Sequence, residues 1–350
     1  MIYRSIIRPI LFRFNPETIH HFVGFSLKLA FSVPGLSWAL RKSFTLTHPL
    51  LEREVFGLKF PNPVGVAAGF DKNASLYHEL AQLGFGFVEV GTITPKAQKG
   101  NPKPRLFRLP LDRALINRMG FNNEGLDAAI RQLKKRKTAI PIGGNLGKNT
   151  LTPNSKAVDD YVLLFKELFP WVDYFVVNVS CPNITDLREL QNRESLLEIL
   201  TRLQKINHQQ PHPKPVLLKV SPDLNESQLD EVIELVETTG IAGVVAVNTT
   251  IRRNHLSTSS SQINRIGKGG LSGKPLQKRA LEVIRYLSEH AEKKFPIIGV
   301  GGVASADDAL QMLEAGADLI QVYTGFIYEG PKLARQINRA ILKKIQQAES

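Results

Sequence analysis

Cysteine is almost absent from this chain. Cys181 is the only one among 350 residues, so no internal disulfide can form and the fold does not depend on an oxidising compartment. No uninterrupted apolar run is long enough to span a bilayer. No small-residue cleavage site closes the N-terminal apolar stretch, which argues against a secretory signal. The sequence therefore predicts a protein without disulfides that does not cross a membrane.

Signatures of metal and nucleic-acid binding are also missing. The chain has no His/Cys cluster with the spacing of metal ligands, so we expect no catalytic metal. The basic run at 131–137 fits a solvated helix face, and no aromatic-interleaved basic motif accompanies it, so we expect no nucleic-acid partner. The formal net charge of +13 nevertheless favours an anionic partner, such as a membrane surface or a phosphorylated ligand.

The first 45 residues form a segment of their own, ahead of a main domain at 46–350. Apolar residues recur at helical spacing over 1–14 and over about 17–32, with Pro16 at the first position of the second helix and Val33-Pro34-Gly35 ending it. Basic residues edge both helices. Two interpretations are equally compatible with this pattern: an amphipathic element at a membrane surface, or a helical hairpin docked on the main domain.

Eight short apolar, β-rich runs follow, most of them separated by a helical pattern. The runs lie at 64–68, 87–90, 141–144, 174–177, 216–220, 244–247, 297–300 and 319–322. The helical patterns lie at 74–83, 124–135, 158–168, 193–207, 226–238, 276–293, 306–315 and 332–346. Strand–helix alternation over eight units predicts an α/β fold, a (β/α)8 TIM barrel. A doubly wound open sheet is the alternative, but its single Gly-rich dinucleotide turn is absent.

Glycine or polar residues lie at the end of every predicted strand. They are Gly69 to Lys72, Gly91 and Thr92, Asn145, Asn178 to Asn183, Lys219, Asn248 to Thr250, Gly301 and Gly302, and Tyr323 to Gly325. Functional residues of barrels lie at these carboxyl ends. The fourth set contains Cys181 between Asn178 and Asn183. A lone thiol is usually a small core residue, but flanked by two amides Cys181 becomes a candidate acid/base or nucleophile.

The chemistry of these strand ends indicates a phosphate-bearing, planar ligand. Glycine clusters after strands seven and eight, and a Gly-rich loop at 269–273, favour phosphate binding by backbone N–H groups. Lys219 lies inside an apolar strand, where an unpaired cation is costly, and would stabilise an anionic reduced ring. Lys72 would bind a carboxylate. The many asparagines offer donors and acceptors to an imide-like ligand such as a pyrimidine.

These motifs resemble the dihydroorotate dehydrogenases from about Pro49 to the last helix. The segments that carry the resemblance are 67–72, 117–123, 178–183, 248–250, 269–273 and 298–302. The N-terminal helices and the segment 187–191 resemble the membrane-associated, quinone-using class 2 enzymes. The resemblance implies an FMN-containing oxidoreductase of pyrimidine biosynthesis that oxidises dihydroorotate to orotate and passes the electrons to a membrane quinone. It also implies a peripheral membrane protein. Because no Arg/Ser-rich transit segment precedes the helices, we expect a bacterial inner membrane, on its cytoplasmic side, and we expect a monomer or weak oligomer.

The resemblance further assigns roles to individual residues. FMN would be lined by Ala68, Gly69, Phe70, Asp71, Lys72, Thr92, Asn145, Asn178, Lys219, Val247, Gly273, Gly302, Tyr323 and Thr324. Substrate would be held by Lys72, Asn117, Arg118, Met119, Gly120, Phe121, Asn178, Asn183, Asn248 and Thr249. Cys181 would remove the proton from C5 while hydride leaves C6 for the flavin, and quinone would arrive through the N-terminal helices.

Cysteine at position 181 departs from the class 2 pattern, which has serine there. Because a thiol is more acidic than a hydroxyl, we expect activity to rise with pH as Cys181 ionises. Two alternatives remain open at this point. One is a soluble class 1-like enzyme that uses fumarate or a nicotinamide-linked acceptor. The other is a non-catalytic barrel that binds a phosphate ligand and has membrane affinity.

Overall fold

Eight parallel strands close into a barrel in this computed structural model, which describes residues 2–180, 190 and 192–349. Their order around the barrel is β3, β4, β7, β8, β9, β10, β12 and β13. The strands are β3 (Val64–Asp71), β4 (Phe87–Ile93), β7 (Ile142–Leu146), β8 (Tyr174–Asn178), β9 (Val216–Val220), β10 (Gly243–Ala246), β12 (Ile297–Val300) and β13 (Leu319–Val322). Each coincides with one of the eight runs, so the (β/α)8 prediction is confirmed.

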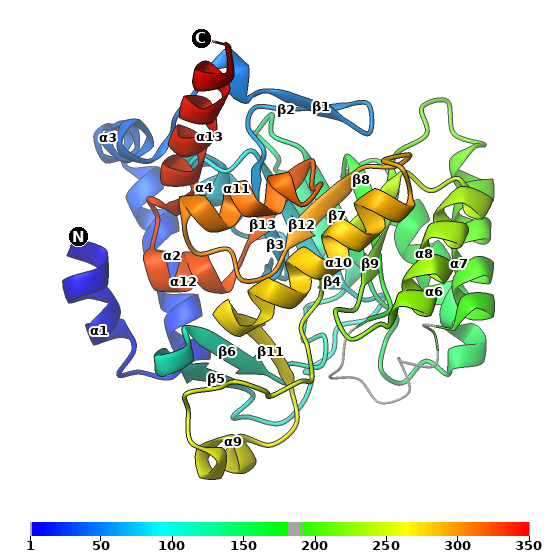
Figure 1. Cartoon of the computed structure of the whole chain (residues 1–350), viewed down its shortest axis with the longest axis horizontal. Helices are drawn as coiled ribbons and strands as arrows, with labels where there is room; N and C mark the ends of the chain where they lie inside the picture. The colour runs from blue at the N-terminus through cyan, green and yellow to red at the C-terminus, as the bar shows by residue number, and fades with distance from the viewer. Residues whose placement is uncertain (1, 181–189, 191, 350) are drawn as a thin grey trace.

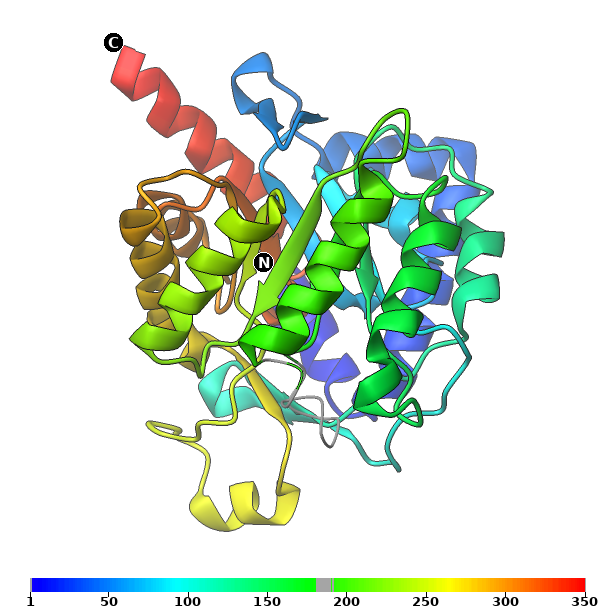
Figure 2. The ribbon, with the colours of Figure 1, turned by 90° about the vertical axis from the view of Figure 1, so that its right-hand side faces the viewer.

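Helices cover the outside of the barrel and bury apolar residues at helical spacing against it. They are α4 (Tyr77–Gln82), α5 (Leu126–Leu133), α6 (Ala157–Leu168), α7 (Arg193–Asn207), α8 (Glu226–Thr239), α10 (Gln277–His290), α11 (Ala306–Glu314) and α13 (Leu333–Glu349). Figure 2 shows α6, α7 and α8 side by side on one flank. In α8 the sequence fixes both ends: Asn225 and Gln228 form a capping box, and Gly240 adopts the left-handed conformation after the last turn.

The barrel interior is apolar at the end where the strands begin. The Phe87 and Tyr174 rings fill it, and glycines opposite make room for them: a Cβ on Gly65 would lie 2.5 Å from the Phe87 ring, and one on Gly143 would lie 2.2 Å from the Tyr174 ring. A hairpin of β1 (Arg53–Val55) and β2 (Leu58–Phe60) adds Val55 and Phe60 to this cluster. It closes the amino end of the barrel. The sequence patterns did not predict this hairpin.

A small antiparallel sheet lies beside the carboxyl ends of the strands. It consists of β5 (Leu106–Leu109), β6 (Ala114–Asn117) and β11 (Gly270–Gly273), and α9 (Ser260–Ile266) precedes β11. The expectation of a loop at 269–273 is therefore wrong for most of that segment. The backbone of β11 pairs with β6, which sets Gly270 opposite Asn117. This pairing brings two segments far apart in the sequence to the same side of the barrel mouth.

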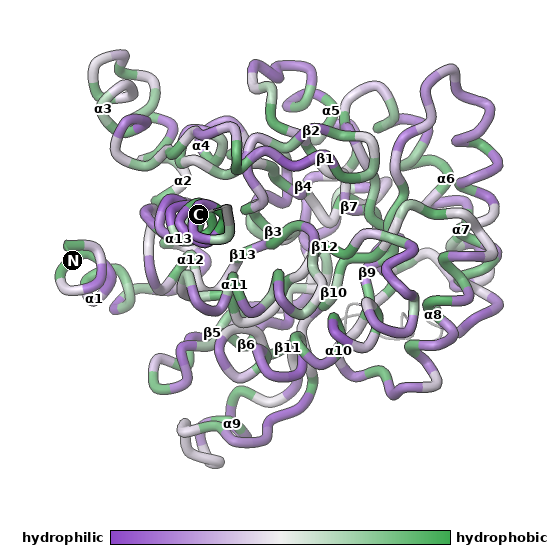
Figure 3. The backbone as a smooth tube through the Cα atoms, turned by 45° about the horizontal axis from the view of Figure 1, so that its top comes forward, coloured by the Kyte–Doolittle hydropathy of each residue, from purple (hydrophilic) through white to green (hydrophobic). Residues whose placement is uncertain are grey.

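The N-terminal segment contains one helix more than expected. A π-helical turn (Tyr3–Ile7) continues into α1 (Arg8–Leu11), and α2 (Pro16–Ser32) and α3 (Pro34–Phe44) follow. Pro34 does end α2, as expected, but because proline is also favoured at a first helical position it begins α3. All three helices lie on the flank of the barrel away from α6, α7 and α8 (Figures 1 and 3).

The N-terminal helices dock on the barrel through apolar side chains such as Phe31, Leu27 and Phe44, which pack against the core, and through polar contacts. The Tyr3 hydroxyl donates to the Ile327 carbonyl at 2.7 Å, and Arg8 donates to the Tyr328 carbonyl at 3.0 Å. Glu17 of α2 forms an ion pair with Arg105, with Nη2 and Oε1 2.5 Å apart and both side chains largely buried. Within the described chain no single helix is long and apolar enough to cross a membrane; α2 and α3 reach that length and composition only together, across a 111° bend.

Candidate active site

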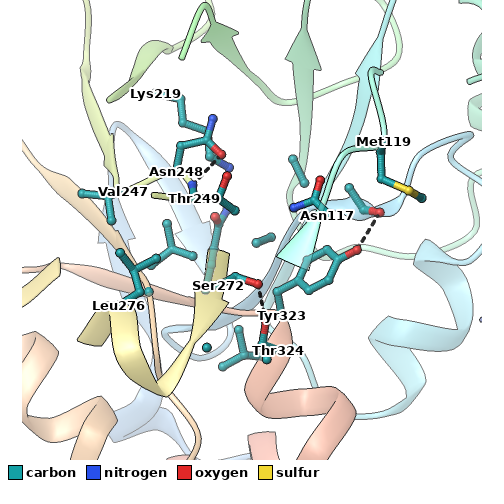
Figure 4. Close-up of a pocket in the computed structure, with 18 of the residues that line it drawn as sticks. Asn117, Met119, Lys219, Val247, Asn248, Thr249, Ser272, Leu276, Tyr323 and Thr324 are labelled. Atoms are coloured by element: carbon teal, nitrogen blue, oxygen red, sulfur yellow. Dashed lines mark hydrogen bonds between the residues drawn. The ribbon is translucent and has the colours of Figure 1, made fainter. Parts of the chain in front are cut away.

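A cavity opens at the carboxyl ends of the barrel strands, beside β6 and β11. It is lined by residues in or just after β3, β4, β8, β9, β10, β12 and β13. In Figure 4, Lys219, Asn248 and Thr249 lie on one side of this cavity, and Asn117, Met119 and Tyr323 lie on the other. Segments separated by 250 residues in the sequence therefore meet in one site, as a barrel requires.

Most of the residues predicted for the site line this cavity. They are Ala68, Gly69, Lys72, Thr92, Asn117, Met119, Gly120, Phe121, Asn178, Lys219, Val247, Asn248, Thr249, Gly273, Gly302, Tyr323 and Thr324. Cys181 and Asn183 lie outside the described residues. The cavity also has lining residues that the sequence patterns did not single out for the site, among them Leu276, Val303 and Gln321.

Four of the predicted site residues lie outside the lining. Asn145 is fully buried behind it, while Arg118 lies over the Phe107 ring, 4.8 Å from its centroid. The Asp71 carboxylate accepts hydrogen bonds from the Ser75 and Leu76 backbone N–H groups and so orders the turn after β3. The Phe70 ring faces the N-terminal helices.

Amide side chains form a directed hydrogen-bond chain along the cavity. Asn248 Nδ2 donates to Asn178 Oδ1 at 3.3 Å, and Asn178 Nδ2 donates to Asn145 Oδ1 at 3.2 Å and to Thr92 Oγ1 at 3.0 Å. Thr92 Oγ1 in turn donates to Asn145 Oδ1 at 2.5 Å. Each amide oxygen accepts a hydrogen bond from the residue before it in the chain, and each amide nitrogen donates to the residue after it. All the amide donors therefore point in the same direction, from Asn248 toward Asn145.

The chain of amides ends at a carboxylate that the sequence patterns did not single out. Asn145 Nδ2 donates to Glu89 Oε1 at 2.7 Å, and Lys219 Nζ lies 3.5 Å from the same oxygen. Lys219 is 5% exposed and Glu89 is fully buried. The expectation that Lys219 is buried is thus confirmed, and its partner is identified. A charge inside the apolar run at 87–90 was the signal that could have revealed Glu89.

A second lysine lies at the opposite wall of the cavity. Lys72, just after β3, donates to Asn122 Oδ1 at 2.7 Å, and both residues line the cavity. Asn117, at the end of β6, donates to the Gly270 carbonyl of β11 at 3.3 Å. The small sheet therefore supplies the Asn117 amide to the cavity that the Lys72 ammonium also lines.

The floor of the cavity is built from glycine backbone. Gly273 and Gly302 have φ values of +100° and +76°, and at both a Cβ would lie within 2.5 Å of neighbouring atoms. Only glycine fits these positions without displacing its neighbours. Between them, the hydroxyls of Ser272 and Thr324 lie 2.8 Å apart (Figure 4). Backbone and hydroxyl groups therefore gather at this end of the cavity, away from the amides.

Aromatic side chains connect the cavity with α2. The Tyr323 ring lines the cavity, its centroid is 5.7 Å from that of Phe70, and Phe70 is 5.1 Å from the His20 ring of α2. Burial, aided by the Lys72 and His21 charges, lowers the pKa of His20 to about 4. The imidazole is therefore neutral at physiological pH. The sequence patterns did not single out His20.

A (β/α)8 barrel whose polar residues gather around a cavity at the carboxyl ends of its strands has the arrangement of barrel enzymes. The profile of the family described as dihydroorotate dehydrogenase matches residues 50–345. The chain belongs to the dihydroorotate dehydrogenase family.

Individual relatives extend this match over nearly the whole chain. A protein of Christiangramia forsetii named dihydroorotate dehydrogenase (quinone) is 58% identical, covering 98% of this chain and 99% of its own length. A protein of the same name from Roseiflexus sp. is 46% identical, covering 98% of this chain and 94% of its own length. The crystal structure of the Eimeria tenella enzyme in complex with ferulenol is 35% identical, with a TM-score of 0.83 over 95% of this chain and 92% of that one. The similarity includes the N-terminal helices.

Proposed function

We propose that this protein is an FMN-dependent dihydroorotate dehydrogenase that oxidises (S)-dihydroorotate to orotate and delivers the electrons to a quinone. The observation that carries the proposal is the cavity itself: a directed set of amides, a buried lysine and a glycine floor at the mouth of a barrel of this family. The names of the relatives, which are quinone enzymes, support the acceptor.

The residues of the cavity fit FMN. Gly273, Gly302 and the hydroxyls of Ser272 and Thr324 offer a close backbone approach and donors suited to a phosphate. Asn178, Thr92 and Lys219 suit the polar edge of a planar ring, and Lys219 would offset negative charge on it. When bound, FMN would supply the two-electron acceptor for the substrate.

The substrate would lie between Lys72 and Asn117 on one side of the cavity and Asn248 on the other. The Lys72 ammonium would pair with the substrate carboxylate, and Asn122 keeps that ammonium at the wall. Asn117 and Asn248 would orient the ring through its amide-like groups, which need both donors and acceptors. Cys181, which lies outside the described residues, is proposed as the base that takes the C5 proton.

Electrons would leave toward the N-terminal helices. The contacts from Tyr323 through Phe70 to His20 join the cavity to α2, and a neutral His20 suits an uncharged acceptor such as a quinone. Phe22, Phe25 and Leu29 of α2 and Trp38 of α3 are exposed apolar side chains, and basic residues accompany them. We propose that this surface binds the membrane peripherally, at a bacterial inner membrane.

Anaerobic addition of dihydroorotate to the purified protein, followed by a short-chain quinone, tests the proposal. We expect flavin absorbance to bleach and then to recover. Bleaching that fumarate reverses and quinone does not would contradict the quinone assignment. A protein without flavin, or with flavin that dihydroorotate does not bleach, would instead support a ligand-binding barrel.

The role of Cys181 is tested separately by Cys181→Ser. Because a hydroxyl is far less acidic than a thiol, we expect the variant to keep part of its activity with the pH profile of flavin bleaching moved to higher pH. Bleaching by the unaltered protein that does not change with pH around the thiol range would contradict the assignment.

A further inference from the structure

Glu89 is a carboxylate in the middle of the barrel. It lies on β4 in the run Phe87-Val88-Glu89-Val90 and is fully buried. Taking a carboxylate out of water costs several kcal/mol unless it is paired and hydrogen-bonded. Such a residue inside a strand that otherwise packs the core requires an explanation beyond packing.

Three strands supply partners to this one carboxylate. Asn145 of β7 donates to Oε1 at 2.7 Å, Gln321 of β13 donates to Oε2 at 2.6 Å, and Lys219 of β9 lies 3.5 Å from Oε1. Two of the partners, Lys219 and Gln321, themselves line the cavity. Glu89 therefore lies directly behind the cavity wall and contacts it from the core.

The carboxylate also explains the direction of the amide chain. An ionised carboxylate accepts hydrogen bonds and cannot donate them, so Asn145 must turn its NH2 group to Glu89. Its oxygen then faces Thr92 and Asn178, and the Asn178 oxygen faces Asn248. The Glu89 carboxylate thus determines the orientation of the Asn145 and Asn178 amide groups along the cavity.

The charge of Glu89 reaches its neighbours. Tyr174 is fully buried in the layer below; burial, followed by the Glu89 charge, raises its pKa well above the ordinary value. The same negative charge lies beside Lys219, with Nζ 3.5 Å from Oε1, and Lys219 lines the cavity. Glu89 and Lys219 together present to a bound ring a cation whose charge is partly offset.

We propose that Glu89 is a positioning residue for the flavin site: it aims the Lys219 ammonium, fixes the donor direction of the amides, and moderates the positive charge at the ring. The proposal rests on the proposed function for the identity of the ring. It adds a residue that does not touch the ligand, acting instead through Lys219 and Asn145.

The charge part is tested by the flavin midpoint potential of the holoenzyme, measured at one pH near neutrality. Glu89→Gln keeps the shape and removes a negative charge, so reduction should become easier, by at least tenfold in the ratio of reduced to oxidised flavin. That ratio corresponds to about 30 mV for a two-electron couple. Lys219→Met should shift the potential in the opposite direction, and the double variant should lie between them.

Opposite signs separate this role from a structural one. A general loosening of the barrel would move both single variants in the same direction. Equal potentials for Glu89→Gln and the unaltered protein, or shifts of the same sign for both variants, would overturn the charge part. Glu89→Asp, which restores the charge on a shorter side chain, should bring the potential back toward the original value.

The pairing part is tested by a double-mutant cycle on the FMN dissociation constant. Each single variant leaves a buried partner unpaired, whereas the double variant removes both charges. We expect each single substitution to raise the FMN dissociation constant at least tenfold. The dissociation constant of the double variant should be at least tenfold lower than the value obtained by multiplying the two single effects. Multiplicative effects would overturn the pairing.

Thermal unfolding of the same four proteins keeps the test independent of the flavin. The Tm of the double variant should lie above the value expected from adding the two single shifts, and additive shifts would overturn the pairing. If the unaltered protein binds no flavin, the proposed function fails, while this cycle still decides whether Glu89 and Lys219 act as a pair.

Discussion

The barrel and the N-terminal helices differ in how much of their apolar surface is exposed to water. Inside the barrel, Leu217 and Ile298 are fully buried. On the helices, Phe25 is 67% exposed and Trp38 is 65% exposed, and attachment to the barrel uses ion pairs and hydrogen bonds such as Glu17–Arg105. The comparison teaches that the barrel is held together by removing apolar surface from water, whereas the N-terminal helices bury one apolar face, add polar contacts to it, and leave a second apolar face exposed.

The largest expected effect is in the barrel interior. Leu217→Ala removes a fully buried side chain and leaves a cavity, so the free energy of unfolding should fall by about 2–5 kcal/mol. Leu29→Ala on α2 is the matched control, because Leu29 is exposed. Urea unfolding measures both. A loss at Leu29 as large as that at Leu217 would remove the difference between the two regions.

The second effect concerns the ion pair that attaches α2. In Glu17→Gln the Arg105 guanidinium keeps its hydrogen bonds to the Lys99 and Asn101 carbonyls but loses its anionic partner. The free energy of unfolding should therefore fall by about 1–3 kcal/mol. Limited proteolysis should also cut near α2 sooner. Glu314→Gln, in the exposed pair with Lys344, is the control and should change stability by at most about 0.5 kcal/mol. Equal effects would contradict an attachment by buried polar contacts.

The third effect is a pH dependence located at His20. Its pKa is about 4 in the folded protein and about 6.5 when unfolded, so the unfolded state binds the proton first as the pH falls. The stability contributed by neutral His20 is therefore complete above pH 6.5 and is lost on acidification to pH 4, by about 1–3 kcal/mol.

Thermal unfolding of His20→Phe and His21→Phe between pH 4 and pH 7 measures this contribution. The neighbours that face His20 include Lys72 and Glu17, so the comparison must be made with the unaltered protein at each pH. The His20 variant should lose part of the pH dependence, and the exposed His21 variant should keep it. Identical profiles for the two variants would contradict the assignment to His20.

The smallest expected effect on stability concerns the exposed apolar side chains of α2 and α3. A substitution there should instead change membrane binding. Trp38→Glu should reduce binding to anionic phospholipid vesicles about tenfold with little change in Tm, since Trp38 is already in water. Leu151→Glu, in the loop after β7 and 96% exposed, is the control and should bind vesicles unchanged. Equal losses for the two variants would show that apolar exposure alone does not define the membrane face.

The sequence predicted the barrel because its strands are buried on both faces and therefore contain continuous apolar runs. It did not predict β5, β6 and β11, since short strands with mixed polarity, such as Gly270–Gly273, have the composition of turns. Pro34 was expected only to end a helix. The same residue type is favoured at both kinds of boundary, so the pattern could not distinguish an end from an end followed by a new start.

The candidate site was likewise predicted only in part from the sequence. Lys219 was predicted because a cation in an apolar strand needs a partner, but the partner lies 130 residues away in the sequence. Only the closed barrel sets β4 and β9 around one interior. His20 was missed for a related reason: its environment is created by Phe70 and Lys72, which a helical pattern in the first residues does not contain.

The one-way chain of amides also has a consequence for proton traffic. Amide side chains neither release nor accept protons near neutral pH, and this chain ends at the fully buried Glu89. It is therefore an insulator for protons even though it is continuous in hydrogen bonds. A proton released at the cavity would therefore not pass along these amides into the barrel interior. In the proposed function, the electrons would move toward α2 without a proton route through the amides.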